Sequence, residues 1–149
     1  MKKITWTQYF IELANLISKK GSCVKRQVGA VIVRDNMVIS TGYNGTPRGV
    51  ANCNEGGCAR CNDATVRSGQ KYDECLCVHA EENAIVQAAY QGVSTKDSIL
   101  FTNLCPCLYC AKSIVNAGIK KVFYNEAFTM DEATIKLLTD AGLEIEKYE

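Results

Sequence analysis

The 149-residue sequence has little net charge, no long apolar run and only one histidine. With 17 Lys and Arg against 16 Asp and Glu, its formal net charge is +1. This balance gives no electrostatic case for binding a nucleic acid or an anionic membrane. No run approaches the ~20 apolar residues of a membrane span, and no apolar segment follows Met1 to Ile4 as a secretion signal requires. We therefore expect a cytoplasmic protein.

Cysteine, in contrast, is abundant, with nine residues in the chain. In a reducing compartment this number favours metal or thiol chemistry over disulfide bonds. The odd count also excludes complete internal pairing. Most of the nine cysteines therefore need a role other than a disulfide.

The overall composition is that of a globular protein. Apolar residues make up 47% of the chain and charged residues 22%. A chain of this size buries about 68–70% of its unfolded surface, which is enough for one real core. We see no internal repeat, low-complexity tract or linker, and we expect a single domain over residues 1–149.

Hydrophobic periodicity predicts an alternation of helices and strands. The predicted helices cover residues 7–20, 79–90, 107–117 and 131–141, and the predicted strands cover residues 28–33, 37–43, 98–102, 121–124 and 143–148. The first two strands form an antiparallel hairpin, and the later strands alternate with helices, which implies parallel pairing and right-handed crossovers. The predicted fold class is α/β, with a mixed five-stranded sheet and helices on both faces. A long loop over residues 44–77 is expected to be functional or held by something.

Three candidate metal ligands and one carboxylate form the most informative motif of the sequence. His79, Cys107 and Cys110 offer one nitrogen and two thiolates, which leaves the fourth position of a tetrahedral zinc site open for water, as in catalytic sites. Taken singly, these residues fit an ordinary histidine and a redox pair or half of a structural site, and Glu81 fits a helix-start acid. Together, H-A-E followed by P-C-L-Y-C matches the signature of zinc nucleobase deaminases.

The same residues suggest how deamination proceeds. Glu81 moves protons from the attacking water to the ring nitrogen and the departing ammonia. The Ala80 N–H donates to a ring carbonyl, and the Cys105 C=O accepts from the exocyclic amine. The ends of two predicted helices point at the metal, and their partial positive charge favours thiolates and hydroxide.

Beyond this signature, the sequence resembles deoxycytidylate (dCMP) deaminases of the bacterial and phage type over most of its length. The matching segments are residues 26–33, 42–49 (G-Y-N-G-T-P-R-G), 79–85, 106–112 and 116–120. The resemblance implies a three-layer α/β/α cytidine deaminase-like fold. It also implies zinc-dependent hydrolysis of dCMP to dUMP, a precursor for dTMP synthesis, in the host cytoplasm if a phage encodes the protein.

Further site residues follow from the resemblance. Asn44 is expected to hold the deoxyribose hydroxyl, and Arg26 either contacts the phosphate or is a plain surface arginine. The family is often activated by dCTP and inhibited by dTTP, with Mg²⁺, at a subunit interface, and commonly forms homohexamers. Asn44, Gly45, Arg48 and Gly49 are the corresponding candidates for the effector site, where glycines let backbone amides approach a triphosphate.

A second, structural zinc is also implied by the resemblance. Its expected ligands are four cysteines, Cys23, Cys53, Cys58 and Cys75, which close a tetrahedral site and hold the long loop. Cys61 or Cys77 can replace one of the four. Histidine serves in such a site in some relatives, but His79 is already assigned here. The alternative is that these cysteines are reduced and packed as small apolar groups.

Two other functions compete with dCMP deamination. One is a deaminase of the same superfamily that acts on cytidine, dCTP or adenosine in tRNA; the near-neutral charge argues against tRNA. The other is a non-catalytic zinc or nucleotide-sensing module, which has no need for Glu81.

Overall fold

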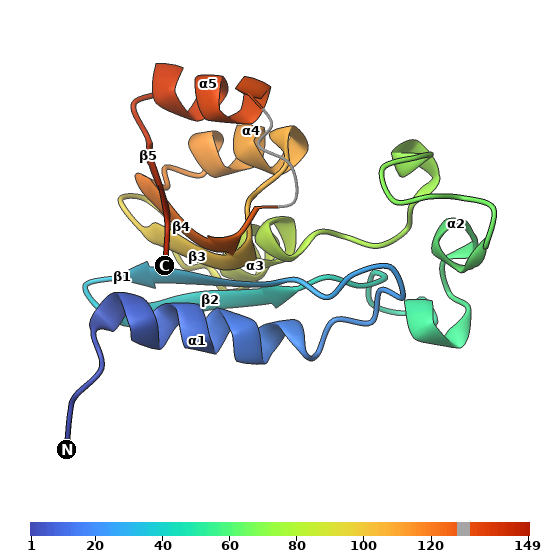
Figure 1. Ribbon diagram of the computed structural model, residues 1–149, viewed down its shortest axis with the longest axis horizontal. Helices are drawn as coiled ribbons and strands as arrows, with labels where there is room; N and C mark the ends of the chain where they lie inside the picture. Colours follow the sequence, from blue (N-terminus) through green and yellow to red (C-terminus); the bar gives the residue numbers. More distant parts are fainter. Residues whose placement is uncertain (128–131) are drawn as a thin grey trace.

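The computed structural model describes residues 1–127 and 132–149, and in it one sheet lies between layers of helices (Figure 1). The order of elements is α1 (Trp6–Ser18), β1 (Gly29–Arg34), β2 (Met37–Tyr43), η1 (Cys53–Glu55), α2 (Ala59–Asn62), η2 (Tyr72–Glu74), α3 (Ala80–Gln91), β3 (Ile99–Leu104), α4 (Leu108–Asn116), β4 (Lys121–Glu126), α5 (Glu132–Asp140) and β5 (Glu144–Lys147). The elements η1 and η2 are 3-10 helices inside the long loop that the sequence predicts.

The sheet has five strands in the order β2-β1-β3-β4-β5. Strand β1 pairs antiparallel with both β2 and β3, whereas β3, β4 and β5 are parallel. The predicted fold class, a mixed five-stranded α/β sheet that opens with an antiparallel hairpin, is confirmed. The turn of that hairpin consists of Asp35 and Asn36, whose φ values of 53° and 57° suit the two-residue turn that joins twisted strands.

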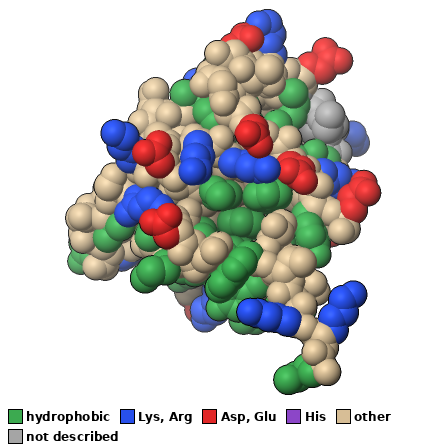
Figure 2. All heavy atoms as spheres, turned by 90° about the vertical axis from the view of Figure 1, so that its left-hand side faces the viewer, with side chains coloured by type: hydrophobic (Ala, Val, Ile, Leu, Met, Phe, Trp, Pro, Cys, Tyr) green, Lys and Arg blue, Asp and Glu red, His purple; other side chains and the backbone are tan. Residues whose placement is uncertain are grey.

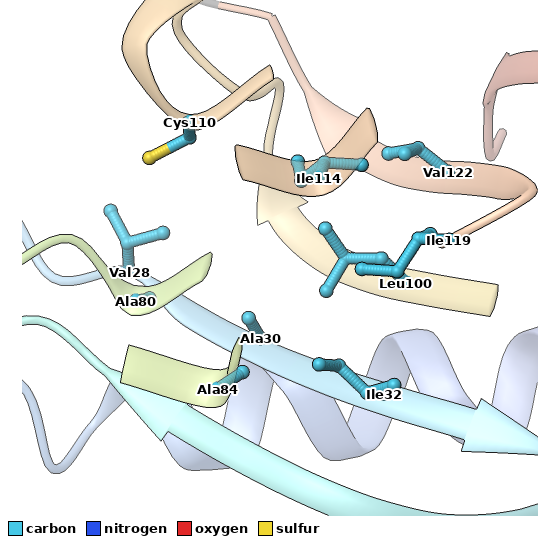
Figure 3. Close-up of a cluster of buried hydrophobic side chains, with 10 residues drawn as sticks. All are labelled: Val28, Ala30, Ile32, Ala80, Ala84, Leu100, Cys110, Ile114, Ile119 and Val122. Atoms are coloured by element: carbon cyan, nitrogen blue, oxygen red, sulfur yellow. The ribbon is translucent and has the colours of Figure 1, made fainter. Parts of the chain in front are cut away.

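Alternate residues of β1 enter two different cores. On one face of the sheet, Val31 and Val33 pack with Phe10, Ile11 and Ala14 of α1 and with Phe101 of β3. On the other face, Ala30 and Ile32 join a cluster that includes residues of α3, α4, β3 and β4 (Figure 3). Because side chains alternate along a strand, β1 is buried on both faces and its apolar run is nearly continuous.

The predicted helices are present, with shifted ends. Helix α1 stops at Ser18, two residues before its predicted end, and Thr5 caps its start by accepting a hydrogen bond from the Gln8 N–H. The helix predicted over residues 131–141 corresponds to α5, and its first residue, Asp131, lies outside the described residues. None of the helices in the described part of the chain combines the length and the apolarity that a membrane crossing needs.

The segment between β2 and α3 extends past the edge of the layers and carries α2 at its far end (Figure 1). On the opposite side of the molecule, Lys and Arg side chains are interspersed with Asp and Glu around exposed hydrophobic groups (Figure 2). The mixture of signs on that face agrees with the small net charge of the chain.

Gly42 of β2 allows α3 to lie close to the sheet. A Cβ at this position would stand 2.3 Å from the Ala80 carbonyl oxygen and 2.4 Å from the Ala84 nitrogen, both of α3. We therefore expect Gly42→Ala to lower the free energy of unfolding by about 1–3 kcal/mol, because backbone rather than a flexible side chain must move. Urea denaturation measures this change.

Thr41→Ala is the matched control for Gly42→Ala. Thr41 is the neighbouring residue on β2, and it is exposed. Removing the Thr41 hydroxyl and methyl groups should change the free energy of unfolding by less than about 1 kcal/mol. Equal losses in the two variants would contradict the close approach of α3 as the reason for the glycine.

Candidate active site and metal centres

Three predicted metal ligands meet where two helices begin. His79 is the N-cap residue of α3, Cys107 is the N-cap residue of α4, and Cys110 lies in the first turn of α4. The His79 Nδ1 atom is 3.5 Å from Cys107 Sγ and 3.3 Å from Cys110 Sγ. The three ligand atoms all lie within 4.8 Å of one another.

These distances fit a tetrahedral zinc ion. Zn–S and Zn–N bonds of about 2.3 and 2.0–2.1 Å place neighbouring sulfur and nitrogen ligands about 3.6 Å apart. Three protein ligands leave one position for water or substrate, which is the arrangement of a catalytic rather than a structural site. Cys110 is also part of the core beneath the site, where it packs with Val28 and Ala80 (Figure 3), so the ligand is held by packed neighbours.

The electrostatics of the three residues favour one thiolate and a charged imidazole. The hydrogen bond from Cys110 lowers the pKa of the Cys107 thiol to about 4. The same pairing, together with burial, raises the pKa of Cys110. The hydrogen bond with Cys107 raises the pKa of His79. A divalent cation that binds here replaces the proton of His79 and those of the thiols, because it binds thiolates and neutral imidazole.

Glu81 lies next to the ligand group and is almost fully enclosed. Its side chain is 4% exposed, and the Cys110 thiol donates to its Oε2 atom over 3.7 Å. Burial raises the pKa of this carboxyl, although the imidazole of His79 opposes the change. A carboxyl with a raised pKa in a cleft is suited to accept and return protons.

A cavity of about 360 Å³ opens onto this group and has the size of a small-molecule site. Every predicted substrate-binding residue lies on its wall, namely Arg26, Asn44, Ala80 and Cys105, beside His79, Glu81 and Cys107. Sequence reasoning missed Lys25, Arg60 and Tyr72, which also line it. Two of them could have been found from the sequence, because Lys25 is adjacent to the predicted phosphate ligand Arg26 and Arg60 is adjacent to Cys61.

Asn44 is fixed by the backbone of the segment that precedes β1. Its Oδ1 atom accepts from the Val28 N–H at 2.8 Å, and its Nδ2 atom donates to the Arg26 carbonyl oxygen at 2.7 Å. The second N–H of the amide remains available for a ligand in the cavity that Asn44 lines. Asn44 therefore holds the backbone at Arg26 in place and also offers a hydrogen-bond donor to a ligand in the cavity.

Six further cysteines gather in the long loop and before β1. Two groups of four have mutually close sulfur atoms: Cys23, Cys53, Cys61 and Cys77 form one, and Cys58, Cys61, Cys75 and Cys77 form the other. The predicted set of Cys23, Cys53, Cys58 and Cys75 is not among them, because it takes two residues from each group. Both groups contain Cys61 and Cys77, which the sequence predicts only as substitutes, because spacing along a loop does not reveal which sulfur atoms lie close together.

The comparisons with known proteins agree with this geometry. Residues 4–126 match the model of the cytidine and deoxycytidylate deaminase zinc-binding region. The chain belongs to this deaminase family. The matched range contains Glu81 and all three residues of the candidate metal group, His79, Cys107 and Cys110.

Several relatives, although not all of them, carry the name deoxycytidylate (dCMP) deaminase. The chain is 50% identical over 144 residues to that of Schizosaccharomyces pombe, covering 97% of this chain and 44% of the relative. It is 36% identical to ComE operon protein 2 of Bacillus subtilis, over all of this chain and 74% of that protein. A structure of dCMP deaminase from the cyanophage S-TIM5 in complex with dCMP and dUMP superposes with a TM-score of 0.79 at 31% identity, covering 99% of this chain and 100% of that one. The chain thus spans less than half the length of the fission yeast relative.

The predicted effector residues lie outside the cavity wall except for Asn44. Arg48 donates to Gln87 of α3 at 2.9 Å and stacks over the Tyr90 ring at 4.6 Å. Gly45 pairs with Val78, the residue before His79, through two backbone hydrogen bonds of 3.2 and 2.8 Å. The loop is therefore joined directly to the segment that carries a metal ligand.

Proposed function

We propose that this chain catalyses the zinc-dependent hydrolytic deamination of dCMP to dUMP. The observation that carries the proposal is a buried carboxylate, Glu81, placed in a cavity beside a three-ligand metal group with an open fourth position. A zinc or nucleotide-sensing module has no use for that carboxylate. The named activities of the relatives supply the substrate class.

The residues around the cavity have different roles in the proposed reaction. A zinc ion held by His79 and the thiolates of Cys107 and Cys110 would supply Lewis acidity, which would bring the pKa of a bound water close to 7. Glu81 takes one proton from the attacking water and delivers it to the ring nitrogen. It then takes the remaining hydroxyl proton and passes it to the exocyclic amine, which leaves as ammonia as the C–N bond breaks and the carbonyl forms. The Ala80 N–H and the Cys105 carbonyl read the base, since hydrogen bonds to the ring carbonyl and the amine orient cytosine toward the metal.

The cations of the cavity wall suit the phosphate of a nucleoside monophosphate. Arg26 and Lys25 are adjacent in sequence and both line the cavity, and the Lys25 Nζ atom donates to the Val66 carbonyl oxygen at 2.8 Å. Charge-assisted hydrogen bonds to phosphate are about twice as strong as neutral ones. Asn44 contacts the Arg26 carbonyl oxygen, so the two residues are neighbours on the cavity wall. Asn44 offers a donor for the sugar hydroxyl, and Arg26 offers a cation for the phosphate.

Arg26→Met tests the phosphate contact. We expect kcat/KM for dCMP to fall by about 10- to 100-fold, since a hydrogen bond to a charged group contributes about 1.5–3 kcal/mol. The rate for deoxycytidine, which lacks the phosphate, should stay within about twofold. Steady-state kinetics with both substrates measure the difference.

Lys20→Met removes a positive charge from an exposed position outside the cavity and serves as the control. It should leave both rates unchanged. Equal losses for dCMP and deoxycytidine in Arg26→Met would exclude a phosphate contact and would return Arg26 to the role of a surface arginine.

The direct test of the function is the absorbance change on incubating metal-analysed protein with dCMP, dCTP, deoxycytidine and CMP. Fast loss of dCMP supports the proposal. A preference for dCTP, deoxycytidine or CMP would move the assignment to another cytosine deaminase. No turnover of any cytosine compound by protein that contains zinc would favour the sensing module.

Regulation by dCTP and dTTP with Mg²⁺, and assembly into hexamers, stay predictions of the family resemblance. The pairing of Gly45 with Val78 supports the idea that Gly45, Arg48 and Gly49 influence the site, because a ligand that moves this loop also moves the backbone next to His79. Stimulation of dCMP turnover by dCTP and suppression by dTTP are the expected results. Turnover that responds to neither nucleotide would contradict the effector site.

A further inference from the structure

Six of the seven cysteines outside the catalytic group form two overlapping sets of four. The two sets share Cys61 and Cys77, and the sulfur atoms within each set all lie within 4.8 Å of one another. One set adds Cys23 and Cys53, and the other adds Cys58 and Cys75. The six residues come from the segment before β1 and from three places in the loop between β2 and α3.

The distances are those of a tetrathiolate metal site. Zn–S bonds of about 2.3 Å place neighbouring sulfurs of a tetrahedron about 3.8 Å apart. The Cys61 sulfur is 3.8 Å from that of Cys23, in the first set, and 3.6 Å from that of Cys75, in the second. Disulfide sulfurs lie only about 2.05 Å apart, and all nine cysteines of the chain are free.

We propose that Cys23, Cys53, Cys58, Cys61, Cys75 and Cys77 bind two zinc ions as one binuclear cluster, with Cys61 and Cys77 bridging the two ions. Two separate tetrahedral ions need eight thiolates, whereas two ions that share an edge need six. A single ion uses four and leaves two buried or half-buried thiols against it with no role. The four terminal ligands are then the four cysteines that the family resemblance assigned to one structural zinc.

The balance of charge explains a buried arginine beside the cluster. Binding two Zn²⁺ displaces six thiol protons to solvent and leaves six thiolates around four positive charges, a net charge of −2. Arg60 is only 6% exposed, and its Nη1 atom is 3.6 Å from Cys61 Sγ. The Arg60 guanidinium also donates to the Gln70 and Arg67 carbonyl oxygens and lies over the Tyr72 ring.

No carboxylate in residues 1–127 or 132–149 lies within 4.0 Å of the Arg60 guanidinium. Carbonyl oxygens satisfy part of the hydrogen bonding of Arg60, but a buried positive charge is best compensated by an anion, and the Cys61 sulfur is the group in contact that becomes one when it binds metal. Other donors also point at sulfur. The Leu76 N–H donates to Cys58 Sγ at 3.3 Å, and the Asn62 amide donates to Cys53 Sγ at 3.9 Å.

The cluster also supplies the core that this part of the chain otherwise lacks. The segment between β2 and α3, residues 44–79, forms a lobe that extends beyond the sheet (Figure 1). Its described elements are only one four-residue α-helix, α2, and two 3-10 helices, η1 and η2. Its buried cluster consists of cysteines alone: Cys53, Cys58, Cys61 and Cys77, with Cys23 and Cys75 partly buried against them. Metal–thiolate bonds can hold so small a unit where apolar packing is insufficient.

The position of the cluster connects it to the substrate cavity. Cys23, Cys75 and Cys77 line that cavity together with Lys25 and Arg60, which lie close to Cys23 and Cys61 in the sequence. Loss of the metals should therefore disorder the cationic wall as well as the lobe. An iron–sulfur cluster fits the residues less well, because its four thiolates would leave two cysteines unused.

The first test is the metal content of the wild-type chain by mass spectrometry, followed by ¹¹³Cd NMR of the cadmium-substituted protein. The expected result is three zinc ions per chain and three cadmium resonances, two of which are in the tetrathiolate range and coupled to each other through the bridging sulfurs. Two zinc ions per chain, two tetrathiolate signals without coupling, or bound iron with sulfide would each overturn the proposal. Metal content is measured without substrate, so the outcome is independent of the reaction that the chain catalyses.

Two substitutions then separate bridging from terminal ligands. Cys61→Ser should reduce the content from three ions to one, since it removes a ligand from both ions. Cys53→Ser should remove one ion, and Cys105→Ser, outside both groups, should remove none. Equal losses in the Cys61 and Cys53 variants would argue against bridging, and the wild-type cadmium spectrum decides the matter if either variant fails to fold.

Discussion

Replacing Glu81 with glutamine is expected to keep the metal and to lower kcat for dCMP by at least about 10³-fold. Glutamine has nearly the same size and keeps hydrogen-bonding capacity, so the packing around the 4% exposed side chain is preserved. It cannot accept or release a proton at neutral pH, however. The loss then measures proton transfer rather than metal binding or folding.

Zinc content, thermal unfolding and steady-state kinetics of the purified variant check this expectation together. Glu82→Gln is the matched control, since Glu82 is the next residue of α3 and does not line the cavity. It should retain both zinc and most of the activity. A Glu81→Gln enzyme with more than ~10% of the wild-type rate would remove Glu81 from the proton-transfer role.

The sheet was predictable because its signals are local. The residues Asp35 and Asn36 between two β-rich runs indicate a hairpin, and alternation of strands and helices after residue 79 indicates parallel pairing. The catalytic group was predictable for a different reason. His79 and Cys107 each cap a helix that follows directly, so short motifs determine where their side chains lie.

The long loop was not predictable in the same way. Its path depends on contacts between residues far apart in sequence, such as Cys23 with Cys61 and Lys25 with the Val66 carbonyl. Spacing alone therefore could not show that Cys61 and Cys77 occupy the shared positions, nor that Arg60 would be buried beside them. Arg48 illustrates the same limit, since the sequence does not reveal its contacts with Gln87 and Tyr90.

Replacing Cys110 with serine is expected to remove the catalytic ion and to lower kcat for dCMP by at least about 10³-fold. Cys110 provides one of three protein ligands, and a serine hydroxyl is a much poorer ligand for zinc than a thiolate. Without the ion, the pKa of the attacking water rises far above 7, so hydroxide is scarce at neutral pH. Metal analysis should show one ion fewer per chain than in the wild type.

Cys105→Ser is the control for the metal content. Cys105 lies five residues earlier, also carries a thiol, and is not in the three-ligand group, so this variant should keep every ion. Cys110 is buried among Val28 and Ala80, and the polar hydroxyl is expected to reduce stability as well. Unfolding measurements therefore accompany the metal analysis, and a folded Cys110→Ser chain with full zinc content would contradict the ligand assignment.

The double variant Glu81→Gln/Cys110→Ser separates two interpretations of these losses. If Glu81 moves the protons of a water that the metal activates, the two residues serve one step, and the double variant should be about as slow as Cys110→Ser alone. Losses that multiply would mean that Glu81 acts independently of the ion. The 3.7 Å contact between Cys110 Sγ and Glu81 Oε2 favours the first result, because it places the carboxylate directly against the ligand group.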